Sequence, residues 1–107
     1  MNNYTNSAEW LHRAEKTIPL GSQTFSKSRI AFPQNAAPLF IERGLGSKVW
    51  DADNNEYIDF VNGLLSVSLG FCDADVNQAV IDQLSSGITF SLPHKLEMEV
   101  AEELTKL

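Results

Sequence analysis

The segment from Val49 to Phe60, VWDADNNEYIDF, constrains the fold more than any other part of the sequence. Strand-forming residues (valine, tryptophan, tyrosine, isoleucine) lie at both of its ends, and Asp53-Asn54-Asn55 lies between them. Asp and Asn tolerate a left-handed φ and hydrogen-bond to the neighbouring backbone, which is the chemistry of a tight turn. We therefore predict a β-hairpin whose turn falls on residues 53–55.

The acidic residues of this segment also raise the question of a calcium site. Asp51, Asp53 and Asn55 occupy alternate positions, as the first three ligands of an EF-hand loop do. Glu56 occupies the position where such a loop needs glycine, and Asn62 the position where it needs a bidentate glutamate. Because both the sharp bend and the strongest ligand are missing, the pattern favours a hairpin turn over a metal site.

Strand-like runs around the hairpin predict a three-stranded antiparallel meander. The runs cover residues 39–42, 48–52 and 56–61, and a break at Gly44-Leu45-Gly46 separates the first two. A helix precedes the meander, with Ser7 as its N-cap and apolar residues at helical spacing as far as Ile18. Between the helix and the meander we expect a long irregular loop.

Two helices are predicted after the meander, which makes the fold class α+β. The first begins after Asp73 or Asp75 and ends at Gly87. The second begins near Pro93, with His94 in the cap position ahead of Glu97. We expect the first helix within residues 1–20, the loop over 21–37, the meander over 38–62 and these two helices over 63–107.

The final predicted helix carries an apolar stripe that reaches the last residue of the sequence. The stripe consists of Leu96, Val100, Ala101, Leu104 and Leu107. No glycine, proline or basic last-turn cluster follows it. Together with the long loop and the thin meander, this pattern predicts a segment whose apolar faces are covered by a larger body.

Charge and composition exclude several classes of partner. Fourteen acidic against eight basic residues give a net charge of −6, which disfavours nucleic acid or an anionic membrane. The single Cys72 cannot form an internal disulfide, and only two histidines are present, so we expect a reducing cytoplasm. We find no secretory signal in the polar N-terminal residues and no apolar run long enough for a bilayer.

The run from Pro38 to Phe60, PLFIERGLGSKVWDADNNEYIDF, resembles the N-terminal meander of the class III aminotransferases. Within that family it is most similar to the glutamate-1-semialdehyde aminomutase-like branch. The likeness extends to Ile18-Pro19-Leu20-Gly21-Ser22 and to the run GITFSLP at residues 87–93, so it covers nearly the whole chain from about Ser7. This resemblance implies the N-terminal segment of a fold-type I enzyme that depends on pyridoxal 5′-phosphate. It further implies amine and carbonyl substrates and a cytoplasmic homodimer.

The chain departs from the aminomutase pattern where the family contacts substrate. The run QTFSK at residues 23–27 replaces Asn-Ser-Pro-Val-Arg, and the run GLLS at residues 63–66 replaces Ser-Trp-Gly-Pro. Lys27 keeps a positive charge but lacks the planar fork with which arginine binds a carboxylate. These changes favour a related aminotransferase over the aminomutase reaction. By resemblance, 21–37 is an active-site loop, and the candidate substrate-binding residues are Gln23, Thr24, Lys27, Gly63 and Leu64.

The catalytic residues of pyridoxal chemistry are expected outside this chain. That chemistry needs a lysine for the aldimine and amide donors for the phosphate. Five lysines are present, but none has the apolar surroundings that suit an aldimine lysine, and no glycine-rich loop opens a helix. We therefore predict that residues 1–107 do not catalyse amino transfer alone. Two alternatives remain open at this point: a stand-alone interaction module that docks a partner, and a truncated inactive product.

Overall fold

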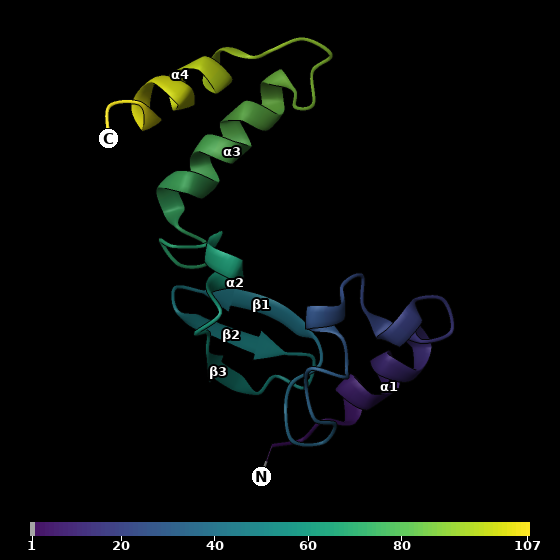
Figure 1. Ribbon diagram of the computed structural model, residues 1–107. Helices are drawn as coiled ribbons and strands as arrows, with labels where there is room; N and C mark the ends of the chain where they lie inside the picture. Colours follow the sequence, from purple (N-terminus) through teal and green to yellow (C-terminus); the bar gives the residue numbers. More distant parts are fainter. Residues whose placement is uncertain (1) are drawn as a thin grey trace. The chain divides into compact units, whose positions relative to one another are not determined.

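The computed structural model describes residues 2–107, which divide into two compact units. The first unit ends at Asp73 and contains the sheet and the N-terminal helix, and the second runs from Ala74 to Leu107 and contains two helices. The predicted α+β class is confirmed, as is the order of helix, loop, meander and helices (Figure 1).

The sheet is the predicted antiparallel meander, with strand order β1-β2-β3. β1 spans Ile41–Leu45, β2 spans Lys48–Asp51 and β3 spans Glu56–Ile58. The central strand β2 pairs Val49 with Gly44 of β1 and with Tyr57 of β3. The turn between β2 and β3 is also confirmed, because Asn54 has a φ of +62° and donates its N–H to the Asp51 carbonyl at 2.9 Å.

The predicted break at Gly44 is wrong, because β1 continues through Leu45 and the turn falls on Gly46 and Ser47. Gly44 is needed in the strand for packing: a Cβ at this position would lie 2.4 Å from Cγ of Phe71. Gly46 instead provides a φ of +55° and exchanges two backbone hydrogen bonds of 2.9 Å with Phe71. Glycine thus serves close packing at one position and backbone conformation at the other.

Helix α1 spans Thr5–Ala14, so it begins before its predicted N-cap Ser7 and ends well before Ile18. Ser7 lies in the first turn and is fully buried. The side chain that meets this helix end belongs to Asp53 of the β2–β3 turn: Oδ1 accepts the N–H of Asn6 at 2.7 Å, and Oδ2 accepts the N–H of Ser7 at 2.9 Å. The small core of this unit consists of Leu11, Val49 and Ala52.

The second unit consists of α3, Ala74–Ser86, and α4, Lys95–Leu104. Gly87 follows α3 with a φ of +98°, as predicted for a helix stop. His94 caps α4: its Nδ1 accepts the N–H of Leu96 at 3.3 Å, while the Glu97 carboxylate accepts the N–H of His94 at 2.8 Å. The structure describes every residue of both helices, and none is buried; the exposed fraction of Leu104 is 64%. Within residues 2–107, no helix has the length and apolarity needed to cross a membrane.

Candidate functional site

The five predicted substrate-binding residues fall into two segments of the first unit. Three of them lie in the loop 21–37, and the other two lie in the short element α2, Asn62–Leu65. The loop lies beside α1, whereas α2 lies at the other end of the sheet, near the β1–β2 turn (Figure 1). The structure therefore does not bring the two groups together within this chain.

Gln23, Thr24 and Lys27 are all exposed. The loop contains two 3₁₀ turns, η1 at Pro19–Gly21 and η2 at Phe25–Lys27, and the N–H of Lys27 donates to the carbonyl of Thr24 at 3.2 Å. Lys27 forms no ion pair with any residue from 2 to 107. Its side chain is thus exposed and has no acidic partner among these residues.

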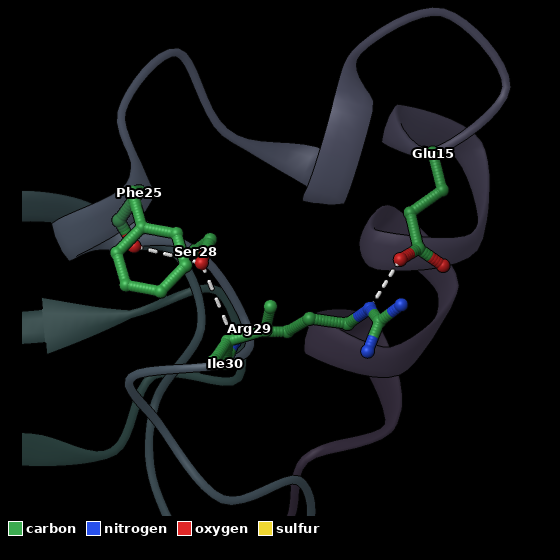
Figure 2. Close-up of polar contacts among 5 residues, drawn as sticks. All are labelled: Glu15, Phe25, Ser28, Arg29 and Ile30. Carbon is green, nitrogen blue, oxygen red and sulfur yellow. Dashed lines mark hydrogen bonds and ion pairs between the residues drawn. The ribbon is translucent and has the colours of Figure 1, made fainter.

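A buried serine follows these residues directly (Figure 2). Ser28 has an exposed fraction of 1%, and its Oγ donates to the carbonyl of Phe25 at 2.7 Å. The same Oγ accepts the N–H of Ile30 at 3.4 Å, and the next side chain, Arg29, pairs with Glu15 just beyond the end of α1. These anchors were not predicted from the sequence; the signal for Ser28 is a serine three residues after the start of a turn, where its hydroxyl can bond back to the chain.

The element α2 is a left-handed turn. The φ values of Asn62, Gly63, Leu64 and Leu65 are +56°, +54°, +58° and +71°. This conformation suits glycine but costs an L-residue with a side chain roughly 1–2 kcal/mol. The exposed fractions of Leu64 and Leu65 are 68% and 80%, so apolar burial within this unit does not offset that cost. The sequence contained no signal for this turn beyond an apolar run without a helical or strand period.

Asp59 fixes the entry to this turn. Its Oδ1 accepts the N–H of Val61 at 2.8 Å and that of Asn62 at 3.3 Å. Its own N–H donates to the carbonyl of Ser47 at 2.9 Å, which ties the turn to the end of the sheet. An open cleft of about 350 Å³ runs along this junction, and Ser47, Asp59 and Asn62 are among the residues that line it.

The acidic hairpin uses the carboxylate of Asp51 to hold its own backbone. Asp51 is 2% exposed; its Oδ1 accepts the N–H groups of Asp53 and Asn55 at 3.0 and 2.8 Å. Its Oδ2 accepts the Asn55 side-chain amide at 2.8 Å and the Tyr57 hydroxyl at 3.0 Å. Burial, followed by hydrogen bonds to the Tyr4 hydroxyl and the Asp51 carboxylate, raises the pKa of Tyr57. Within residues 2–107, no three His, Cys, Asp or Glu side chains cluster as a metal site would require.

The described residues do not assemble a site for pyridoxal phosphate. All five lysines are exposed, and three of them are paired with a glutamate. These lysines are Lys16, Lys27, Lys48, Lys95 and Lys106. A phosphate could use the amide donors at a helix N-terminus, but Asp53 accepts those of α1 and His94 accepts one of those of α4. Neither the lysines nor the N-termini of α1 and α4 therefore offer a place for the cofactor within this chain.

The comparison with protein families gives a match to the class III aminotransferases over residues 30–107. A glutamate-1-semialdehyde 2,1-aminomutase of Natranaerobius thermophilus is 37% identical to this chain over 99 residues. The matched region covers 92% of this chain and 23% of the aminomutase. The chain thus spans less than a quarter of the length of this relative.

Solved structures of two proteins resemble the chain over the same share of its length. An ω-transaminase from Sphaerobacter thermophilus is 34% identical with a TM-score of 0.81, and the match covers 92% of this chain and 22% of that enzyme. The FumI protein of Sphingopyxis sp. MTA144, in its pyridoxal phosphate internal aldimine form, is 31% identical with a TM-score of 0.80. That match covers 92% of this chain and 23% of FumI.

Proposed function

This chain belongs to the class III aminotransferase family, and we propose that it is the N-terminal segment of a pyridoxal 5′-phosphate-dependent aminotransferase or aminomutase. The complete enzyme would transfer an amino group between an amine or amino acid and a carbonyl compound. One observation carries the proposal: 37% identity extends over 92% of this chain while covering only 23% of the aminomutase. A segment related to the enzyme at this level shares its local structure without containing the whole protein.

In this proposal the chain does not catalyse amino transfer by itself. The second unit supports this, because both of its helices expose apolar side chains that a monomeric protein rarely leaves in contiguous patches. In the complete enzyme, the rest of the polypeptide covers these helices. The cofactor, its aldimine lysine and its phosphate donors belong to that remainder, in keeping with five lysines here that are all exposed.

The contribution of this chain is to bind and orient the substrate. Lys27 attracts an anionic group, Gln23 and Thr24 offer polar contacts, and Gly63 with Leu64 forms an apolar wall. Since these two segments lie apart in the first unit, the rest of a cytoplasmic homodimer would have to complete the site around them. The missing arginine fork at position 27 favours an aminotransferase over an aminomutase.

Trapping with borohydride tests whether the aldimine lysine lies outside residues 1–107. Residues 1–107 and the complete polypeptide are each mixed with pyridoxal phosphate, reduced with borohydride and digested for mass spectrometry. We expect a stoichiometric adduct at one lysine only in the complete polypeptide, together with amino transfer to a carbonyl acceptor. A stoichiometric adduct at a single lysine of residues 1–107 alone would contradict the proposal.

The role of Lys27 is tested by Lys27→Ala in the complete enzyme. Loss of a charge that binds substrate equally in the ground and transition states raises KM and leaves kcat unchanged. Lys16→Ala is the matched control, because Lys16 is also exposed and forms no ion pair within residues 2–107. If both variants keep the KM of the wild type, Lys27 has no place in the substrate site.

A further inference from the structure

In the loop a polar residue is buried while its apolar neighbours are exposed. Between residues 23 and 36, the sole buried residue is Ser28, with an exposed fraction of 1%. Phe25 and Ile30 on either side of it are 68% and 55% exposed. A buried hydroxyl needs hydrogen bonds to offset the loss of water, so its position inside the loop points to a role in fixing the backbone.

The hydroxyl of Ser28 ties together the residues before and after it. It donates to the Phe25 carbonyl at 2.7 Å, and the same carbonyl accepts the N–H of Ser28 at 3.0 Å. It also accepts the N–H of Ile30 at 3.4 Å, so both of its bonds lie within one short arc of chain (Figure 2). Lys27 lies inside this arc, and its own N–H is bonded to the Thr24 carbonyl.

A second contact attaches the same arc to the helix side of the unit. Figure 2 shows the Arg29 side chain extending away from Ser28 toward Glu15, with which its Nε pairs. Both partners are more than a third exposed, and an ion pair of that kind contributes little free energy. The buried hydroxyl is therefore the stronger of the two anchors.

We propose that Ser28 is a positioning residue for the substrate-binding loop. Its hydroxyl fixes residues 25–30 so that the ammonium group of Lys27 faces the anionic group of the substrate. This inference rests on the proposed function, in which Lys27 binds that group. Because Ser28 itself is buried, it does not touch the substrate, and its removal weakens binding rather than amino transfer.

The test compares Ser28→Ala with the matched control Ser85→Ala. The Ser85 hydroxyl on α3 also donates to a carbonyl three residues earlier, that of Asp82, at the same distance of 2.7 Å, but it is exposed and belongs to the second unit. Amide hydrogen exchange in the complete polypeptide gives the first measurement. Ser28→Ala is expected to speed exchange over residues 27–30 by up to about tenfold, the value of one hydrogen bond. Ser85→Ala leaves exchange over these residues unchanged.

Kinetics give the second measurement, with alanine and isopropylamine as amino donors. Isopropylamine has a methyl group where alanine has its carboxylate. Ser28→Ala is expected to raise the KM for alanine by about two- to tenfold, with kcat unchanged and the KM for isopropylamine unchanged. In a Lys27→Ala background the same substitution adds no further rise, because the group it positions is gone.

The possible outcomes distinguish the positioning role of Ser28 from the proposed function. Unchanged exchange in Ser28→Ala overturns the inference, and so does a KM rise that is equal for both donors or that persists in the Lys27→Ala background. An absence of amino transfer in the wild-type polypeptide refutes the proposed function itself. Amino transfer with a KM indifferent to Ser28 refutes only the positioning role.

Discussion

Asp53 offers a quantitative test of how the first unit is held together. Its carboxylate accepts the N–H groups of Asn6 and Ser7, so the turn of one hairpin supplies the cap of a helix 46 residues away in sequence. Loss of a helix cap costs about 1 kcal/mol, and loss of a carboxylate from the positive end of a helix costs a further 0.3–1 kcal/mol or so. Asp53→Ala should therefore lower the free energy of unfolding by about 1–2 kcal/mol.

Two variants separate the hydrogen bonds from a general effect of charge. Asp53→Asn keeps one oxygen acceptor but loses the second oxygen and the negative charge. We therefore expect it to lower the free energy of unfolding by roughly half as much as Asp53→Ala does. Glu42→Gln is the control, because Glu42 is exposed on β1 and forms no ion pair within residues 2–107. Urea unfolding measures the free energy of unfolding of all three variants. Trp10 on α1 serves as the fluorescent probe, because its ring packs edge-on against that of Phe40, with 5.8 Å between the ring centroids.

The same contact has a predictable pH dependence. Partial burial acts to raise the pKa of Asp53, but the N–H groups of Ser7 and Asn6 outweigh it and hold that pKa below its ordinary value. A depressed pKa contributes stability that is present above the unfolded-state pKa, near 3.9, and lost as the pH falls through the folded-state value. The difference between wild type and Asp53→Ala should thus be constant near neutrality and narrow below about pH 4. A difference near zero at pH 7, or one that does not change with acid, would refute the reasoning.

Two further predictions concern the sheet. Gly44→Ala places a methyl group 2.4 Å from Cγ of Phe71 and should lower the free energy of unfolding by about 1–3 kcal/mol. The methyl group of Gly46→Ala meets no atom within 4 Å, so this variant should lose about 1 kcal/mol of that free energy, for its positive φ alone. Thermal melting ranks the two, and equal losses would contradict the packing argument. Tyr57→Phe removes the hydroxyl that donates to Asp51 and should cost about 1 kcal/mol near neutral pH. Because the pKa of Tyr57 is raised in the folded state, the wild type should lose stability as the pH rises above about 10, and alkaline unfolding titrations should show less of this loss in Tyr57→Phe.

The elements that depend on neighbouring residues could be predicted from the sequence. The turn at Asp53-Asn54-Asn55 forms because the nearby carboxylate of Asp51 accepts the N–H groups of Asp53 and Asn55, and Gly87 stops α3 through its own φ. The errors arose where a distant residue decides the outcome. Ser7 is a good local N-cap, yet Asp53 supplies the contact, and Gly44 is a good local break, yet the Phe71 ring keeps it in the strand.

The candidate site was predicted in part for the same reason. Resemblance selected Lys27, Gly63 and Leu64, but it did not indicate that Leu64 lies in a left-handed turn or that a buried Ser28 holds the loop. Leucine is rare at positive φ, so no sequence pattern signals it; the bonds from Asp59 that fix the entry to the turn become visible only in three dimensions. The residues that contact a ligand are thus easier to find from sequence than the residues that orient them.

The link between Asp53 and α1 also sets an order of events during synthesis. Helix α1 leaves the ribosome before the acceptor for its first turn has been translated, and a ten-residue helix is marginal in water without such support. Its N-H groups at Asn6 and Ser7 must remain bonded to water until residue 53 has emerged. Helix α1 is therefore made before the residue that secures it, and a pause in translation before the hairpin would leave this helix open to proteases.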